Sequence, residues 1–414
     1  RNLSPDIVIP KSYQANAGFE REVAKGMVFE TNVTFNRTVN LWRETNPNAP
    51  ILPSSVADTN SDGRVTYTDY LLGLTSGTNR FFSGVVGEVG GTHDGSPTAT
   101  AACTTATTLC YVNVNTSSTT FPTGGCATAA PNTAYCRAIA ALNPLRPAAL
   151  FAQFGQAQLE TVTSIGNSRY IGAVFELRNR YTRFKNGFGG SWRLSYTLSR
   201  LMDDGIVNTS DPTVPGDFRG DWSRSLADRT HRVSLTATVD LPKWLGKLRL
   251  SPVIRYGSSA PFNLSAGGVD RNLDDLSNDR PNFTGNVGDI PWRVYGSTFP
   301  AQLASQLSLA PLGSPGTLPR NAGKGPALWQ FNLNVTREFK LTERLRLRPS
   351  VEATNPLNMR VFSYGSNFIN FDNLSLCTTG GTLTAAQQAT CDGFVAPTRT
   401  MTHRRVRLGL RFDF

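Results

Sequence analysis

Long apolar runs are the first feature that this sequence lacks. Hydrophobic residues make up 39% of the 414 residues, and no stretch approaches the ~18 to 20 consecutive apolar residues that a membrane-spanning helix requires. The chain could cross a membrane only with strands, in which alternate side chains face lipid and the others line a polar interior. Because half of each such strand is polar, the low apolar content does not exclude a membrane protein.

Catalytic motifs are scarce as well. The three histidines, His93, His231 and His403, are isolated from one another, and no His-Glu-x-x-His, Gly-x-Ser-x-Gly or phosphate-loop pattern occurs. We therefore expect no enzyme activity and no catalytic residues. His231 and His403 lie in or beside strand-like segments, where we expect a polar role at a rim or in an interior.

A signal peptide is also missing. The chain starts at Arg1 with Asn-Leu-Ser-Pro, without an initiator methionine or an apolar h-region. We expect the numbered chain to be part of a longer precursor.

Basic residues outnumber acidic ones, 41 against 30, and the formal net charge is +11. A surplus of this size in a soluble protein would suggest nucleic acid as a partner. Here, however, cations such as Arg344, Arg346 and Arg348 stand at alternate positions of a strand, not in a helical stripe or a lysine-rich tail. We expect this charge to line a lumen and its rim, and we expect no nucleic-acid partner.

Period-two alternation of apolar and polar residues recurs along the chain, in segments about as long as a tilted transmembrane strand. Counting them gives nine strands. They are 12–22, 27–37, 168–182, 190–202, 230–241, 248–258, 327–340, 344–353 and 400–414.

The connections between these segments alternate between short turns and long loops. The long ones are predicted at 38–167, 203–229, 259–326 and 357–399. Outer-membrane barrels have short periplasmic turns and long extracellular loops, whereas a soluble β-sandwich has no such asymmetry. The pattern predicts an all-β chain, an antiparallel transmembrane outer-membrane β-barrel in which 38–167 is a long extracellular loop insertion.

Strand direction predicts that these nine strands do not close a barrel by themselves. If the last strand runs towards the periplasm, the first does too, and two strands with the same direction cannot seal an antiparallel seam. Single-chain bacterial barrels have even strand numbers. Either the count is wrong by one strand, or the remaining strands lie upstream. The abrupt start of the chain favours the second alternative, in which residues 1–414 form the C-terminal part of one larger barrel.

The end of the chain alternates up to a terminal aromatic, with Val406, Leu408 and Leu410 on one face. This segment resembles the closing strand of a bacterial outer-membrane β-barrel, in which a polar residue is followed at fixed spacing by a glycine and two aromatics. The matching positions are Arg407, Gly409, Phe412 and Phe414. The resemblance implies that the barrel-assembly machinery recognises this strand as its signal, and it places the chain in the outer membrane of a Gram-negative bacterium, in contact with lipid.

A wider part of the sequence resembles the C-terminal barrel of Oar-like TonB-dependent receptors. The resemblance rests on Arg320-Asn321, Gly325-Pro326, the strand 331–335 that leads to Phe339, and 345–358, and on the fragments 228–232, 241–242, 258–262 and 278–281. The chain departs from the family pattern at Thr354 and Pro356, where the family has an aromatic and an apolar residue, and in the unusual length of the loop at 38–167.

This resemblance implies a barrel of about 22 strands, as in other large outer-membrane barrels, preceded by a carboxypeptidase-regulatory-like domain and a plug. Neither the plug nor the energy-coupling box that contacts the TonB complex occurs in these 414 residues. The implied function is binding and translocation of a substrate, whose identity the sequence leaves open. The alternative is a structural or adhesive surface protein that keeps the barrel without active transport.

The segment 58–69 has the spacing of a calcium-binding loop. Such loops place oxygen ligands at positions 1, 3, 5, 7 and 12 and a glycine at position 6. The predicted ligands are Asp58, Asn60, Asp62, the carbonyl of Arg64 and Asp69, with Gly63 at the turn. We expect structural Ca2+ here; the alternative is a polar turn before a short helix.

A second acidic stretch lacks the glycine. It contains Asp270, Asn272, Asp274, Asp275 and Asp279. A solvated loop is the default expectation, with calcium as the alternative.

Six cysteines lie in Thr, Ser and Gly-rich segments, and none has zinc-ribbon or Cys-x-x-Cys spacing. They are Cys103, Cys110, Cys126, Cys136, Cys377 and Cys391. An even number in loops indicates disulfides in an oxidising compartment. We expect pairing between sequence neighbours, although the first four allow three arrangements.

Overall fold

The structure is a computed structural model. It describes residues 2–59, 61–73, 139, 142–155, 158–205, 211–266, 270–308, 310–311, 313–364, 368–370, 377, 382–397, 399–401 and 403–414. Among these residues no helix has the length and hydropathy needed to span a membrane.

Nine long strands form one antiparallel sheet in which sequence neighbours are also neighbours in space. This confirms the predicted number and order of the strands. They are β2 (Lys11–Ala24), β3 (Met27–Thr45), β4 (Thr161–Arg183), β5 (Gly189–Asp203), β7 (His231–Asp240), β8 (Leu248–Gly257), β13 (Leu328–Arg337), β15 (Arg346–Thr354) and β19 (Arg405–Asp413).

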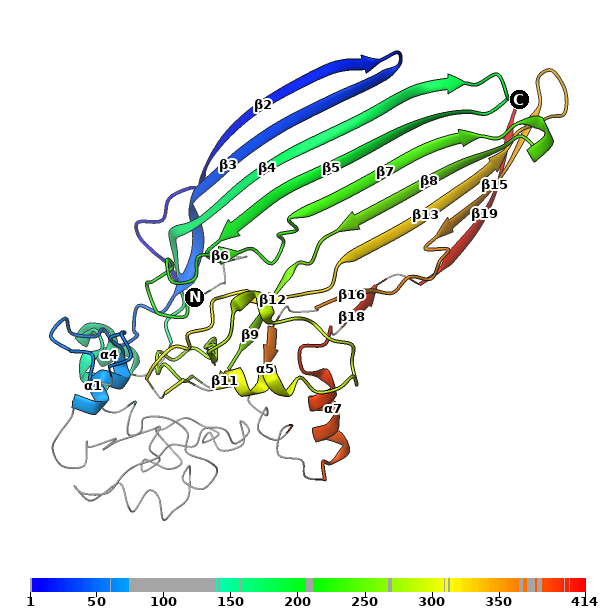
Figure 1. The fold of residues 1–414 in the computed structure, drawn as a ribbon. Helices are drawn as coiled ribbons and strands as arrows, with labels where there is room; N and C mark the ends of the chain where they lie inside the picture. Colours follow the sequence, from blue (N-terminus) through cyan, green and yellow to red (C-terminus); the bar gives the residue numbers. More distant parts are fainter. Residues whose placement is uncertain are drawn as a thin grey trace.

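Figure 1 shows these strands as one curved layer, with the short turns at one end and the helices and short strands gathered at the other. We call these the turn end and the loop end. At the turn end, residues 25–26 join β2 to β3, and 184–188 join β4 to β5. The β7–β8 turn, 241–247, contains the 3-10 helix η3 (Lys243–Leu245), and β14 (Phe339–Lys340) belongs to the β13–β15 connection.

The register separates the two faces of the sheet. On β13, Leu333 lies across from Pro252 of β8 and from Ala353 of β15. The next residue, Asn334, lies across from Ser251. Because side chains alternate between faces along a strand, one face becomes apolar throughout and the other polar.

The apolar face is not covered by a second layer. Phe19, Leu194 and Trp329 are exposed on it, and Leu408 of β19 is 78% exposed. A soluble sheet buries such a face against another layer, and a bare apolar surface of this extent marks contact with a partner or a membrane. The sheet therefore requires an apolar surrounding on this side.

The two edges of the sheet are β2 and β19. With nine strands that alternate in direction, β2 and β19 run the same way, as the sequence predicted. In the described part of the chain, neither edge strand has a second neighbour, so the sheet is an open wall and not a closed barrel.

The predicted loop at 38–167 is wrong at both ends. Strand β3 continues to Thr45 and β4 begins at Thr161. The two strands remain paired beyond Thr38, but the register shifts around Leu41, and Asn40 has a positive φ of 58°. A bulge of this kind interrupts period two, which is why alternation alone ended the strands too early.

The long connections fold into a platform at the loop end. Its helices are α1 (Tyr67–Gly73), α4 (Ala148–Phe154), α5 (Ala301–Gln306) and α7 (Ala385–Gly393), with the 3-10 helices η2 (Asn143–Leu145) and η4 (Val287–Asp289). The short strands here are β9 (Pro261–Ser265), β10 (Asn282–Phe283), β11 (Leu307–Ser308), β12 (Gly323–Lys324), β16 (Val361–Ser363), β17 (Phe368–Asn370) and β18 (Arg399–Met401). Two further pieces, β1 (Asn2–Leu3) and β6 (Ser223–Arg224), lie beside β4 and β5.

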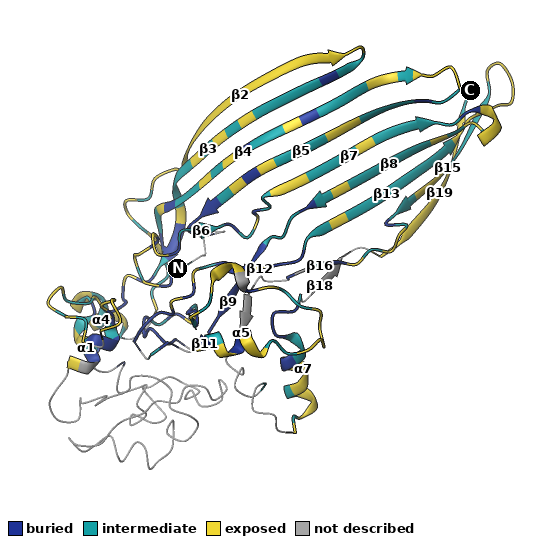
Figure 2. Ribbon diagram, viewed as in Figure 1, coloured by how far each residue is buried: buried dark blue, intermediate teal, exposed yellow. Residues whose placement is uncertain are grey.

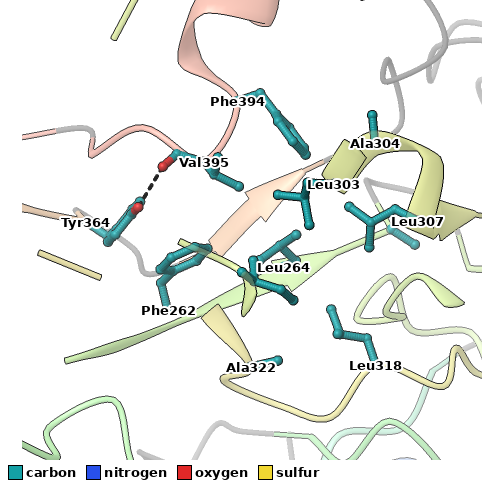
Figure 3. Close-up of a cluster of buried hydrophobic side chains, with 12 residues drawn as sticks. Phe262, Leu264, Leu303, Ala304, Leu307, Leu318, Ala322, Tyr364, Phe394 and Val395 are labelled. Carbon is teal, nitrogen blue, oxygen red and sulfur yellow. Dashed lines mark hydrogen bonds between the residues drawn. The ribbon is translucent and has the colours of Figure 1, made fainter. Parts of the chain in front are cut away.

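This platform has its own hydrophobic core, which the sequence did not predict. Figure 3 shows Phe262 and Leu264 of β9 beside Leu303 of α5 and Phe394, and the cluster is buried. The hydroxyl of Tyr364 donates to the carbonyl of Val395 at 2.8 Å. In Figure 2, burial is concentrated at the loop end, whereas the strands are mostly half-buried or exposed. The long loops are thus packed against one another.

Candidate functional site

The polar face of the sheet carries a network of ion pairs near the turn end of β2 to β5. Arg178 on β4 lies 2.6 Å from Glu20 of β2 and 3.2 Å from Glu30 of β3. On β5, Arg193 reaches Glu176 at 2.7 Å. Two arginines and three glutamates are thus linked across four neighbouring strands.

A groove of about 990 Å3 occupies the polar face farther along, at the turn end of β7 to β19. Asp240 at the end of β7 accepts two hydrogen bonds from Arg249 of β8, at 2.6 and 2.9 Å, and one from the hydroxyl of Tyr181 at 2.6 Å. Arg348 of β15 donates to Glu338 at 2.9 Å. The sequence predicted lumen charge in general, but only the strand register identifies which charges meet here.

At the loop end, a buried polar cluster joins the connection 46–160 to the connection 258–327. Arg146 donates to both carboxylate oxygens of Asp275, at 2.6 and 2.9 Å. Asn46 donates to the carbonyl of Asp274 at 3.1 Å. The Tyr67 hydroxyl donates to the Pro50 carbonyl. Burial raises the pKa of that hydroxyl, and the nearby negative charge of Asp274 raises it further.

Three aspartates of this cluster are buried together, so the default expectation of a solvated loop was wrong. Burial raises the pKa of Asp270 and Asp274 well above 3.8, and neighbouring aspartates add to the shift. Burial also raises the pKa of Asp279 to about 7, although the backbone amides of Asn272 and Arg271 oppose the shift. Removing a carboxylate from water disfavours its charged form. The carboxyl groups of this cluster therefore favour the protonated, neutral form.

The predicted calcium loop has the required backbone turn. Gly63 has φ +82°, a conformation that favours glycine. The carboxylate of Asp58 accepts hydrogen bonds from the amides of Asp62 and Gly63, at 3.2 and 2.9 Å. Asp62 accepts from the Arg64 amide at 2.8 Å. These hydrogen bonds close the turn around Gly63.

The acid at position 12 of this loop turns back into it. Asp69 is buried and accepts hydrogen bonds from the amides of Thr59 and Thr66, at 2.7 and 2.8 Å. Asn60, the predicted ligand at position 3, lies outside the described residues. Within the described ranges, no three His, Cys, Asp or Glu side chains are grouped so as to hold a metal ion. The oxygen donors and the turn suit Ca2+ in type, while the carboxylates here bind backbone amides.

The second acidic stretch repeats this backbone pattern without a glycine. Asp270 accepts hydrogen bonds from the amides of Asp274 and Asp275, at 3.1 and 2.8 Å, as Asp58 does in the first loop. Asp275 has φ 74°, close to the value at Gly63. Aspartate tolerates this left-handed conformation better than most residues, so the turn forms here without a glycine.

One predicted disulfide is confirmed. Cys377 and Cys391 are joined, with an S–S distance of 2.00 Å. The disulfide links Cys377, which precedes α7 in the sequence, to Cys391 within α7. Cys103, Cys110, Cys126 and Cys136 lie outside the described residues.

The predicted assembly signal forms the edge strand β19. Arg407, Gly409 and Phe412 lie within the strand and Phe414 follows it, 96% exposed. Gly409 lies across from Ser350 of β15.

Of the three histidines, His231 has a defined environment. Its Nδ1 lies 2.9 Å from the hydroxyl of Tyr196, and the two rings stack at 6.2 Å. Both residues share the face of Val233 and Leu235, so His231 lies at the rim of the apolar face. His93 lies outside the described residues, and His403 is exposed.

Comparison with known families explains the bare apolar face and the asymmetric connections. A family model described as "Outer membrane beta barrel domain" matches residues 1–402. The chain belongs to the outer membrane β-barrel domain family. The barrel domain is thus a bacterial outer-membrane protein. In such barrels the apolar face contacts lipid, the short turns are periplasmic and the long loops are extracellular.

Solved structures add a further likeness to the barrel domain. It is similar to the crystal structure of the outer membrane transporter YddB from Escherichia coli, with a TM-score of 0.42 and 6% sequence identity. The similarity covers 99% of this chain and 33% of that chain, so the barrel domain spans about a third of that protein. No curated protein matches the chain.

Proposed function

We propose that the barrel domain is part of a TonB-dependent outer-membrane receptor of the Oar type, which binds a substrate at the cell surface and moves it through the barrel lumen. The observation that supports this most is the polar face, which carries charged side chains to the periplasmic end of the wall. Glu176 there is 6% exposed and paired with Arg193. A charged lining of this kind suits a polar, water-filled lumen through which a substrate could pass.

The two edge strands support the same proposal. Because β2 and β19 run the same way, a closed antiparallel barrel requires an odd number of additional strands between them. Such a barrel is larger than the sheet described here, and larger barrels enclose a lumen that a plug can fill.

The partner that defines this function is the TonB complex. We expect the full-length protein, in detergent, to retain the purified periplasmic domain of TonB on an affinity column. Deletion of the energy-coupling segment of the full-length protein is the control and should abolish retention. If the full-length protein does not retain TonB under conditions where a known receptor does, TonB-dependent transport is excluded.

A structural or adhesive role is the second candidate, and the folded platform favours it. The platform has a hydrophobic core and a disulfide, more order than a channel mouth requires. Loss of cell adhesion on exchange of 258–327 for a short linker, with no effect on TonB retention, would support this second role.

We also propose that loop 58–69 binds Ca2+. Asp58, Asn60, Asp62, Asp69 and the Arg64 carbonyl would supply oxygens, and the ion would brace the platform by stabilising its folded form. Calorimetric titration of the intact protein should show that it binds calcium at millimolar or lower calcium concentrations. The double variant Asp58→Asn, Asp62→Asn should bind calcium at least tenfold more weakly. Asp217→Asn, in another exposed loop, is the control. Absence of uptake would exclude the site.

A further inference from the structure

The groove at the periplasmic end has a large excess of positive charge. Eight of its lining residues are lysine or arginine, and only Asp240 and Glu338 are acidic. The whole chain has 41 basic and 30 acidic residues. The groove therefore concentrates cations far beyond the average of the chain.

Its acids are already occupied. Asp240 binds Arg249 and the hydroxyl of Tyr181, and Glu338 lies between Arg346 and Arg348. These pairs fix the floor of the groove without neutralising its rim.

Three lysines form this rim. Lys185, Lys243 and Lys247 are exposed, and none forms an ion pair with a residue that the structure describes. Like charges repel one another, so an anion bound in the groove that all three line would lower that repulsion.

The lysines are held together because their turns pack on each other. Phe188 of the β4–β5 turn contacts Trp244 of the β7–β8 turn edge to face, with ring centroids 6.2 Å apart. A Cβ added at Gly187 would lie 3.1 Å from the Cβ of Pro242. The two turns thus pack against each other and bring their lysines to the same groove.

Lys247 also has an unfavourable backbone conformation. Its φ is 51°, in the left-handed region, where glycine and asparagine are favoured and a long side chain is strained. Its amide donates to the Pro242 carbonyl at 3.2 Å and closes the turn. Local stability alone would favour asparagine at this position, so a lysine here is better explained by its charge.

The floor of the groove can also form hydrogen bonds. Asn334, Thr336 and Ser350 line it between the arginines. The Oδ1 of Asn334 is buried and has no hydrogen-bond partner among the described residues. A ligand that carries both anionic and hydroxyl oxygens would satisfy these groups.

We propose that this groove binds small multivalent anions that carry phosphate or carboxylate groups. A volume of about 990 Å3 is at the upper end for small-molecule sites, and the rim lysines and floor donors would bind several anionic oxygens at once. The proposal rests on the proposed function, because it names the chemical class of the substrate that would leave the lumen here. Binding of the anion to the groove does not itself require transport.

The test is calorimetric titration of the purified full-length protein in a non-ionic detergent. Pyrophosphate serves as the phosphate probe and citrate as the carboxylate probe. The groove variant combines Lys185→Gln, Lys243→Gln and Lys247→Asn, and the Lys247 change suits the left-handed backbone. The control variant combines Lys11→Gln, Lys25→Gln and Lys340→Gln, which change the net charge equally and lie outside the groove.

We expect the wild-type protein to bind at least one probe, with an affinity that falls as salt rises. The groove variant should bind it at least tenfold more weakly, and the control variant should bind like wild type. The Lys247→Asn change alone should weaken binding without lowering the melting temperature.

Three outcomes would overturn the proposal: no binding of either probe at millimolar concentration, unchanged affinity in the groove variant, or an equal loss in the control variant. Since TonB is absent from this experiment, failure of TonB retention would leave its result unaffected. A positive result with only one probe would identify which anionic group the groove prefers.

Discussion

The guanidinium of Arg146 is fully buried and donates to both carboxylate oxygens of Asp275, 129 positions away in the sequence. This pair joins two long connections at the loop end that the sequence gives no reason to place together. It also fixes Asp275, whose left-handed backbone closes the second acidic loop.

Arg146→Ala should therefore loosen the platform. Breaking a buried pair by removing one partner costs about 3–5 kcal/mol, and limited proteolysis should cleave the connections at 46–59 and 270–290 much faster. Arg146→Lys should give an intermediate result because lysine cannot form the two-pronged contact. Arg346→Ala removes an exposed partner of Glu338 and should have little effect. Equal protection in Arg146→Ala and wild type would contradict this role.

The buried aspartates predict a dependence on pH. The folded-state pKa of Asp279, about 7, lies above its ordinary 3.8, so the folded platform binds the proton more tightly than the unfolded chain. The resulting stabilisation is complete below pH 3.8 and is lost as pH rises through 7. Amide hydrogen exchange of 270–280, measured in a chelator, should be slower at pH 5.5 than at pH 8 after correction for intrinsic rates.

Asp279→Asn is the matched variant for this pH effect. It keeps the size of the side chain and removes its titration, so the difference in protection between pH 5.5 and pH 8 should shrink. Asp217→Asn, in an exposed loop, should leave the difference unchanged. A platform equally protected at both pH values in the wild type would show that the aspartates do not titrate in this range.

The two faces of the sheet predict opposite responses to charge. Leu333→Arg places a cation on the lipid face and should cost about 2–4 kcal/mol near the bilayer midplane, so the folded fraction in the outer membrane should fall. Asn332→Arg, one residue earlier, places the same charge on the polar face and should assemble almost normally. Heat-modifiable mobility of the extracted protein measures both. Equal folded fractions would show that the faces are wrongly assigned.

Two glycines in the sheet predict a contrast between backbone and side-chain contacts. A Cβ at Gly190 would lie 2.7 Å from the Thr238 carbonyl, whereas one at Gly409 would lie 2.5 Å from the Ser350 hydroxyl. A hydroxyl can rotate away and a strand carbonyl cannot. In protein refolded in detergent, where the assembly machinery plays no part, Gly190→Ala should thus cost about 1–3 kcal/mol of folding free energy, and Gly409→Ala should be mild. The reverse order would contradict the strand register.

The sequence predicted the strands well because each strand reveals its own two faces by alternation. The count of nine, the order and the odd parity all follow from that local signal. It failed at Thr38 to Leu41, where a bulge breaks the period while pairing continues. The platform core was missed for a different reason, since Phe262 meets Tyr364, with ring centroids 4.5 Å apart, only after segments far apart in the sequence are brought together.

The candidate sites show the same division. The turn at Gly63 and the Cys377–Cys391 pair were predictable because both depend on short spacings. The groove at the turn end was not predictable, because Asp240, Arg249 and Arg348 come from three strands and meet only through the register. The signal available in the sequence was the alternation of cations within strands. It indicates that these cations lie on the polar face, but it does not indicate which residues of the neighbouring strands they meet.

The outer edges of β2 and β19 have a consequence for the order of membrane entry. Each directs a row of backbone amides and carbonyls away from the sheet, and every such group left unpaired in hydrocarbon costs several kcal/mol. A wall of nine strands with two such rows would be rejected by the bilayer in spite of its apolar face. Edge pairing is therefore a precondition of insertion, and a chain whose edges stay unpaired should accumulate in the periplasm.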